Sequence, residues 1–407
     1  MTSPSRYFDH AATTPVRDTA VRVLTEMMPR LANPASLHGA GRRARLEVDE
    51  ARARLATTLG AHPSEVIVTS GGTEADNLAL KGLWWSRRAE DPRRRRVLLP
   101  GIEHHAVLDT AEWLESQEDA ELVLLPVGAD GVLDLEASCA LLEELIAEEP
   151  ESVALATLMW ANNETGALQP VAPFARACAA YGIPLHSDAV QAFGGEPVGA
   201  EPVDFAASGA ATLAVSAHKI GGPVGIGALL VRRDVPLTPV LHGGGQERDI
   251  RSGTLDAAGL CAFAAVAEEV VAQRVEESAR IAALRDTLLE AVIDVEGVTL
   301  RGPDPRTHPE RRLPNNLHLT VDGAEGDSLL FMLDMAGFDT ATGSACTAGV
   351  PRPSHVLLAM GLSEDQARGA QRLTLGHTTT ADDVEALAAA LPRIIAQARA
   401  AGMAAGR

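Results

Sequence analysis

Short apolar segments alternate with longer helical segments from Val66 to Val231, and this alternation restricts the fold more than any other feature of the sequence. Strands are expected at residues 66–69, 97–99, 122–126, 153–160, 184–186, 213–215 and 228–231. Helices are expected between them at residues 74–85, 105–114, 135–147 and 171–181. Strands separated by helices of this length are typical of a mainly parallel, doubly wound sheet. The sequence therefore predicts an α/β fold.

Two helices are expected before the first of these strands. One covers residues 16–28 and stops near Pro29. The turn Asn33-Pro34-Ala35-Ser36 places Ser36 where it can cap a second, long helix that ends at Gly60.

The character of the sequence changes after Leu255. Long charged amphipathic helices are expected from about residue 257 to 295, with short strands near residues 298–300 and 316–321 and helices at residues 327–335 and 381–399. This pattern predicts a second, smaller α+β domain, and 407 residues are enough for two domains. We expect the large domain to cover residues 16–256 and the smaller one to combine residues 1–15 with 257–407.

Charge and cysteine content argue against several classes of protein. A net charge of -20 does not suit a nucleic-acid binder, which would present a basic face. The run Arg93–Arg96 is interpreted as a solvated loop, and it leaves open a local docking patch for an acidic partner. Residues 1–10 do not resemble a signal peptide, and no apolar run reaches the ~18 residues of a membrane span. The four cysteines are far apart and form no CxxC pair, which favours a reducing cytoplasm over zinc or disulfides.

Lys219 occupies an unusual position for a lysine. It lies in Ser216-Ala217-His218-Lys219-Ile220-Gly221-Gly222-Pro223, between two expected strands. A lysine there is costly to desolvate unless its amine has a chemical task, and Schiff-base formation with a carbonyl is the commonest such task. The ordinary alternative is a loop lysine that reaches solvent.

Four features follow the ends of expected strands, where open α/β sheets bind ligands. They are the turn Ser70-Gly71-Gly72-Thr73, His104, Asp188 with Gln191, and Lys219. A glycine turn ahead of a helix suits a phosphate, a carboxylate suits a ring nitrogen, and an amine suits a carbonyl. Pyridoxal phosphate has each of these groups. Each feature is weak by itself, so their order and spacing carry the prediction.

The chain resembles the cysteine desulfurases, a group within the class V aminotransferases and the fold-type I pyridoxal-phosphate enzymes. The similarity runs from Tyr7 to Gly376. It rests on the segments Asp9-His10-Ala11-Ala12-Thr13-Thr14-Pro15, Thr69-Ser70-Gly71-Gly72-Thr73-Glu74-Ala75-Asp76-Asn77, Glu103-His104-His105-Ala106-Val107-Leu108, Asn162-Asn163-Glu164-Thr165-Gly166, His186-Ser187-Asp188-Ala189-Val190-Gln191, Ser216-Ala217-His218-Lys219, His242-Gly243-Gly244-Gly245-Gln246-Glu247 and Arg251-Ser252-Gly253-Thr254.

The resemblance implies a role for individual residues. Lys219 would bind the cofactor and remove the α proton of the substrate, while His104 would stack on the cofactor ring and handle protons. Asp188 would pair with the ring nitrogen and Gln191 with the ring oxygen. The phosphate would be held by Gly72, Thr73, Ser216 and His218, joined by Thr254 from a neighbouring subunit, which implies a homodimer. The substrate would be held by Asn163, which would also contact the cofactor, and by Arg372 and Asn33. Arg372 would form two parallel hydrogen bonds to its carboxylate.

Cys346 distinguishes this group from its aminotransferase relatives. Small residues surround it in Thr342-Gly343-Ser344-Ala345-Cys346-Thr347-Ala348-Gly349, which predicts an exposed, mobile loop where a thiol can act as a nucleophile and then deliver sulfur. The other cysteines, Cys139, Cys178 and Cys261, are interpreted as small hydrophobic residues on apolar helix faces.

The Gly-Ser-Ala-Cys-Thr pattern around Cys346 resembles the long-loop subgroup of the family. The resemblance implies that L-cysteine is converted to L-alanine, with a persulfide left on Cys346. Its sulfur would pass to an iron–sulfur scaffold or another acceptor protein, with tRNA thiolation as a second destination. No intrinsic metal is expected, although the persulfide could transiently ligate an iron–sulfur cluster.

Three other functions are left open. An aminotransferase or selenocysteine lyase of the same fold would share the features up to Lys219 without requiring Cys346. A hydrolase would pair Cys346 with His355 or His377 and would be colourless. A non-catalytic sulfur-relay protein would need neither Lys219 nor Asp188.

Overall fold

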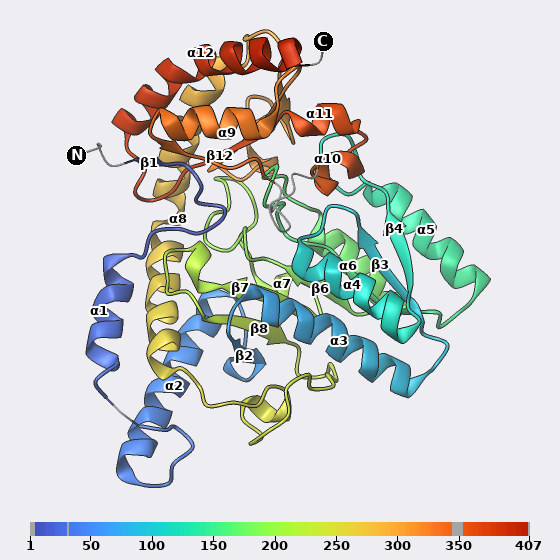
Figure 1. The fold of residues 1–407 in the computed structure, drawn as a ribbon. Coiled ribbons are helices and arrows are strands. Elements are labelled where there is room, and N and C mark those ends of the chain that lie inside the picture. The colour runs from blue at the N-terminus through green and yellow to red at the C-terminus, as the bar shows by residue number, and fades with distance from the viewer. Residues whose placement is uncertain (1–4, 31, 344–352, 406–407) are drawn as a thin grey trace.

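A computed structural model describes residues 5–30, 32–343 and 353–405 (Figure 1). Cys346 lies outside the described residues. The strands of the large sheet are β2 (Val66–Thr69), β3 (Arg96–Pro100), β4 (Glu121–Leu125), β5 (Val153–Thr157), β6 (Leu185–Asp188), β7 (Thr212–Ser216) and β8 (Gly227–Val231). The helices of this part are α1 (Asp18–Met27), α2 (Gly39–Thr58), α3 (Gly72–Glu90), α4 (His105–Glu118), α5 (Leu135–Glu148), α6 (Val171–Ala179) and α7 (Phe205–Ser208), with 3-10 turns at Pro63–Glu65, Ala217–Lys219 and Glu247–Asp249.

The large sheet is mainly parallel, as predicted. Its seven strands lie in the order β2-β8-β7-β6-β5-β3-β4. Strands β4, β3, β5, β6 and β7 pair in parallel, and β8 pairs antiparallel with both β7 and β2. Since β8 alone is reversed within this sheet, the carboxyl ends of β2, β3, β5, β6 and β7 share one edge. That edge is where the predicted site residues were expected.

Helices cover both faces of this sheet. Successive strand residues point to opposite faces: Val97 and Leu229 join an apolar core with α3 and α4, whereas Leu98 and Leu230 join a second core with α2, α6 and α8. Strands buried on both faces must be apolar throughout, which explains the continuous apolar runs in the sequence.

A smaller antiparallel sheet, β12-β10-β9, forms the second part of the chain. Its elements are α8 (Ala257–Val292), β9 (Val298–Arg301), a 3-10 turn at Pro309–Arg311, β10 (Asn316–Val321), α9 (Gly326–Met335), β11 (Phe338–Asp339), α10 (His355–Ala359), α11 (Glu364–Arg368), β12 (Ala370–Thr374) and α12 (Ala381–Ala405). β1 (Arg6–Tyr7) pairs in parallel with β11, so the N-terminal segment joins this second part of the chain (Figure 1).

Helix α8 belongs to both parts of the molecule. Its N-terminal half, including Leu260 and Val270, packs into the core of the large sheet, and its C-terminal half, including Ile281 and Leu289, packs into the core of the smaller one. The long ribbon is visible beside the sheet in Figure 1. We retain the division at residues 256 and 257 as a proposal, with α8 assigned by sequence to the smaller domain.

Several local features differ from the sequence predictions. His38, not Ser36, caps α2, and its Nδ1 accepts the Gly41 amide at 3.2 Å. The several helices expected at 257–295 are one helix of 36 residues. Strand β12, which carries Arg372, was not expected, because its polar sequence Ala-Gln-Arg-Leu-Thr gives no apolar run although all five residues are buried.

The run Arg93–Arg96 is a solvated loop only in part, because Arg96 begins β3 and is buried. Each of the four guanidinium groups forms an ion pair within the chain, with acidic partners that include Asp91, Glu149 and Glu151. Among the described helices, none combines the length and the hydropathy needed to cross a bilayer.

Candidate active site

One cavity of about 230 Å³ lies at the shared edge of the large sheet. Every predicted cofactor residue except Thr254 lines it, namely Gly72, Thr73, His104, Asn163, Asp188, Gln191, Ser216, His218 and Lys219. They come from the ends of β2, β3, β5, β6 and β7 and from the segments that follow. The strand order brings together residues up to 147 positions apart in sequence, from Gly72 to Lys219, which is what the prediction required.

Lys219 lies at the end of the 3-10 turn that follows β7. Its Nζ donates to the carbonyl oxygens of Ala11 at 2.6 Å and Ala12 at 2.9 Å. Burial, reinforced by the positive charge of Arg372, lowers the pKa of the Lys219 amine to about 8. A substantial fraction of the amine is therefore neutral near physiological pH, as a nucleophile or a base requires.

Asp188 and His104 face the same space. Asp188 ends β6, is buried, and accepts the Val190 amide at 2.8 Å. His104 caps α4, and its Nδ1 accepts the Ala106 amide at 3.1 Å. Burial lowers the pKa of His104, so the ring is neutral and its remaining proton is on Nε2. A neutral imidazole beside a buried carboxylate suits a flat ring with a basic nitrogen.

The N-terminus of α3 forms the phosphate end of the cavity. Gly71 has φ 153°, which L side chains rarely adopt, and a Cβ on Gly72 would approach Val190 to 2.8 Å. The Ser216 hydroxyl is buried and has no hydrogen-bond partner among the described residues. A helix N-terminus with an unsatisfied hydroxyl fits a phosphate group. Together with Asp188 and Lys219, these residues fit pyridoxal phosphate.

A second cavity of about 270 Å³ adjoins the first and shares His104, Asn163, Gln191 and Lys219 with it. Arg372 lines this second cavity. Its Nη2 donates to Asp9 Oδ1 and its Nη1 to the Asn163 carbonyl, both at 2.9 Å, while the buried Nε has no partner among the described residues. Gly343 and His355 also line it, and they flank the undescribed segment that carries Cys346. An anchored guanidinium here suits a substrate carboxylate.

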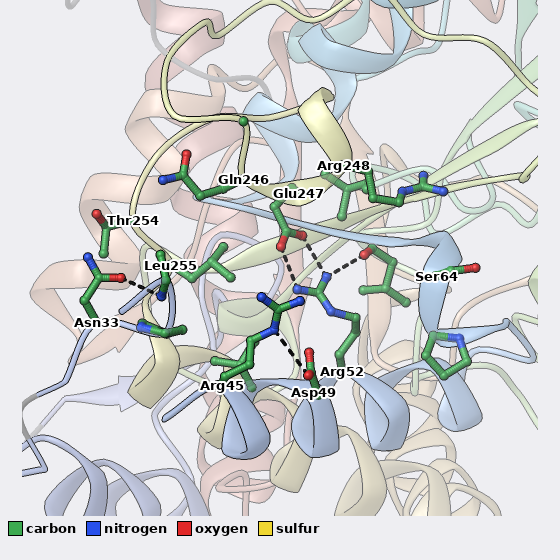
Figure 2. A pocket seen from close by; sticks show the side chains of 17 residues that line it. Asn33, Arg45, Asp49, Arg52, Ser64, Gln246, Glu247, Arg248, Thr254 and Leu255 are labelled. Carbon is green, nitrogen blue, oxygen red and sulfur yellow. Dashed lines mark hydrogen bonds and ion pairs between the residues drawn. The ribbon is translucent and has the colours of Figure 1, made fainter. Parts of the chain in front are cut away.

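Thr254 and Asn33 lie apart from Lys219, in a third cavity of about 320 Å³. Both side chains are exposed, and Figure 2 shows them beside each other. Nearby, Arg52 forms two hydrogen bonds to Glu247 at 2.6 and 2.7 Å. The single chain therefore does not bring Thr254 or Asn33 to its own Lys219. This position suits Thr254, which was expected to serve a neighbouring subunit.

Sequence reasoning assigned no role to three buried residues around Asp188: Asp76, Glu103 and His186. All are at most 1% exposed. All three lie within the segments on which the family resemblance rests. The sequence feature that could have identified Asp76 and Glu103 is an acidic side chain within an otherwise apolar helix face or after an apolar strand. Ligand atoms of Asp76, His104 and Asp188 lie within 4.8 Å of one another, a separation that a metal ion could also use. The absence of an intrinsic metal therefore stays a prediction.

Comparison with known proteins agrees with this geometry. The family model "Aminotransferase class-V" matches residues 6–387. The chain belongs to the class V aminotransferase family. The match takes in the Asp9 segment, the cavity residues, Arg372 and the position of Cys346, so the fold-type I architecture and the family assignment are confirmed.

Several relatives within the class V family carry more specific names. The chain is 48% identical to an "IscS-like cysteine desulfurase" of Mycobacterium tuberculosis, over 98% of each protein. It is 36% identical to a "Cysteine desulfurase IscS" of Methanosarcina thermophila, over 97% of this chain and 92% of that protein. A solved "NIFS-LIKE PROTEIN" superposes with a TM-score of 0.84 at 32% identity, covering 97% of this chain and all of the other.

Proposed function

We propose that this chain is a pyridoxal-phosphate-dependent cysteine desulfurase. The observation that carries the proposal is the meeting of the Lys219 amine, the Asp188 carboxylate and the Ser216 hydroxyl in one cavity, with Arg372 in the cavity beside it. The desulfurase relatives, which match over nearly the whole chain, support the same reaction.

The residues divide the work of binding. Lys219 holds the aldehyde of the cofactor, Asp188 its ring nitrogen and Gln191 its ring oxygen. Thr73, Ser216 and His218 hold the phosphate together with the N-terminus of α3 and Gly72. Asn163 and Arg372 orient L-cysteine, because the Asp9 ion pair fixes the guanidinium while its Nε stays available.

Pyridoxal phosphate, when bound, supplies an aldehyde for the amino group of the substrate and a ring that withdraws electrons from its α carbon. The Lys219 amine, with its lowered pKa, accepts the α proton. His104, a neutral imidazole that carries its proton on Nε2, exchanges a proton with the substrate thiol. Cys346, as a thiolate, takes the sulfur: a sulfur–sulfur bond forms as the carbon–sulfur bond breaks, and alanine leaves after protonation.

The hydrolase alternative has weaker support. His377 lines a different cavity, with His10, and burial lowers its pKa to about 4. His355 Nε2 is already committed to the Glu103 carbonyl at 2.9 Å. Such an enzyme would also leave the Lys219 cavity without a task.

The finer assignments belong to the same proposal. The sulfur on Cys346 passes to an iron–sulfur scaffold or another acceptor protein, in the cytoplasm. The enzyme works as a homodimer in which Thr254 contacts the phosphate bound by the neighbouring subunit, and the exposed position of Thr254 supports this. Asn33 lies beside Thr254, so its contact with substrate would likewise be made across the dimer.

The test of this function is Cys346→Ser. Wild-type protein given cysteine without a reductant should gain one sulfur atom on the Cys346 peptide and release about one alanine per site, as covalent transfer requires. The variant should keep the yellow cofactor and still change its spectrum with cysteine, but should release no alanine, because a serine hydroxyl is almost never anionic at neutral pH. Mass spectrometry and amino-acid analysis provide the readouts.

Cys139→Ser is the matched control, because Cys139 is only half-buried and its pKa is raised by burial. It should behave as wild type. Alanine release by Cys346→Ser at the wild-type rate, or sulfur on Cys139, Cys178 or Cys261, would overturn the assignment in favour of a lyase or an aminotransferase.

A further inference from the structure

Asp76 lies close to Asp188 in the lining of the cofactor cavity. It lies on α3, three residues after Thr73, so the two share one side of the helix. Asp76 lines the cavity, is 1% exposed, and has an Oδ2 with no hydrogen-bond partner among the described residues. Its carboxyl group lies within 4.8 Å of the Asp188 carboxyl.

A chain of polar groups supports Asp76 from behind. Its Oδ1 lies 3.1 Å from His186 Nε2, and His186 Nδ1 lies 2.9 Å from the Thr212 hydroxyl. Asp76, His186 and Thr212 are all buried, and burial lowers the pKa of His186 to about 3, so the ring is neutral. A neutral histidine carries one proton, which can be on either nitrogen.

One arrangement of protons pairs every polar atom of this network. If His186 Nε2 donates to Asp76 Oδ1 and the Thr212 hydroxyl donates to Nδ1, then Oδ2 of Asp76 is free to carry a proton. The Asp188 carboxylate lies within 4.8 Å and is the anionic acceptor toward which that proton can point. The terminal torsion of an aspartate is soft, so its rotation can shorten the distance between the two carboxyl groups.

The surrounding charges favour the same protonation state. Two adjacent buried carboxylates repel each other and lose hydration, so one of them takes a proton. Burial, with repulsion from Asp188 and Glu103, raises the pKa of Asp76 well above its usual value. Burial raises the pKa of Asp188 as well, but the Val190 amide and the Lys219 amine oppose that rise, whereas nothing opposes it at Asp76 among the described residues, so the negative charge is placed on Asp188. Burial and Asp188 raise the pKa of Glu103 to about 8.

We propose that Asp76 is a positioning residue that acts as a neutral acid: its Oδ2 hydroxyl donates to Asp188 and holds that carboxylate against the ring nitrogen of the cofactor. The contact between Asp188 and a ring nitrogen rests on the proposed function, whereas the hydrogen bond from Asp76 to Asp188 does not. Asp188 is then the single anion among three buried carboxyl groups, which keeps the negative charge where the cofactor needs it.

Two substitutions of Asp76 test whether its carboxyl group acts as a neutral hydrogen-bond donor or as an anion. Asparagine keeps a donor toward Asp188 and an acceptor for His186, so Asp76→Asn should bind pyridoxal phosphate within about twofold of wild type. Asp76→Leu has similar volume and no donor, and should lose roughly tenfold or more, as expected when a hydrogen bond to a charged group is removed. Affinity is measured by spectral titration of the apo-protein. The absorption band that reports ring protonation should shift with pH in the leucine variant only.

A measurement on the apo-protein keeps the proposal testable if Asp76→Leu misfolds. Because Glu103 is neutral as well, wild-type protein should show protonated-carboxyl infrared bands from both Asp76 and Glu103, and the Asp76 band should be the one lost in Asp76→Asn, whatever the enzyme catalyses. Absence of that band, or equal damage by asparagine and leucine, would overturn the neutral-acid role. Wild-type affinity in Asp76→Leu would overturn the positioning role. A wild-type protein that takes up no pyridoxal phosphate, with the band present, would refute the proposed function and leave the neutral acid standing.

Discussion

At the residue scale, burial decides which groups of the site carry charge. Lys219 donates to two backbone carbonyl oxygens, and among the described residues no carboxylate lies at hydrogen-bonding distance to offset the desolvation of its ammonium group. The same physical cause makes His104 neutral. The site therefore contains a partly deprotonated amine and a neutral imidazole, and both groups can exchange protons at neutral pH.

The lowered pKa of Lys219 predicts how the apo-protein takes up its cofactor. Only the neutral amine attacks an aldehyde, and below pH 8 its fraction falls about tenfold per pH unit. The rate of covalent uptake, followed by absorbance, should rise with pH and level off near the pKa of about 8. A lysine peptide with the ordinary pKa of about 10.4 serves as the reference, and Lys219→Ala should give no covalent product. A rate that rises past pH 10 in parallel with the peptide would mean that Lys219 is not desolvated.

At the element scale, most regular elements followed from the sequence. The strands at residues 66–69 and 316–321 have the predicted bounds. The elements that were missed are short or polar, such as β12 around Arg372. Their conformation is set by pairing with strands distant in sequence, here β10, and not by a local apolar pattern.

In the candidate site too, residues within sequence motifs could be predicted, whereas contacts between elements far apart in sequence could not. Motif residues that follow strands, such as Asp188 and Lys219, were identified because strand ends converge in this class of fold. The burial of Asp76 against Asp188 could not be read from the sequence, because it depends on how α3 packs on β6 and β7. The place of Cys346 relative to these groups remains a prediction, since it lies outside the described residues.

One close packing of elements makes a sharp prediction at Gly227, the first residue of β8. A Cβ there would lie 2.7 Å from the Gly71 Cα and from the Val215 carbonyl oxygen, and backbone atoms have little freedom to move aside. Gly227→Ala should displace the phosphate turn, lowering cofactor affinity and stability by about 1–3 kcal/mol, the usual cost of overpacking. Gly39→Ala, where a Cβ meets only the ends of two arginine side chains, is the matched control. Thermal unfolding and cofactor titration measure both effects, and equal behaviour of the two variants would contradict this account.

At the scale of the whole molecule, the cavity containing Thr254 and Asn33 lies apart from the chain's own Lys219. If Thr254 completes the neighbouring site, each subunit of a dimer carries parts of two active sites. Such sharing can be tested by mixing two inactive proteins, because a heterodimer redistributes the intact parts.

The prediction uses Lys219→Ala and Thr254→Asp, whose new carboxylate would repel the phosphate. Each homodimer should be inactive or nearly so. In the mixed dimer one site combines an intact Lys219 with an intact Thr254 from the other subunit, so alanine release should return to about half of the wild-type rate per dimer, since one of its two sites is complete. Gel filtration confirms dimers in every sample. No recovery after subunit exchange would place Thr254 in its own subunit's site or outside the sites altogether.

Helix α8 runs through both parts of the molecule and is about 54 Å long, because it has 36 residues that rise 1.5 Å each. Half of its apolar surface completes one core and half completes the other, so neither part of the chain is a separable unit. A shift of α8 along its own axis would therefore misplace one apolar core or the other, so this one continuous helix holds the two cores in register.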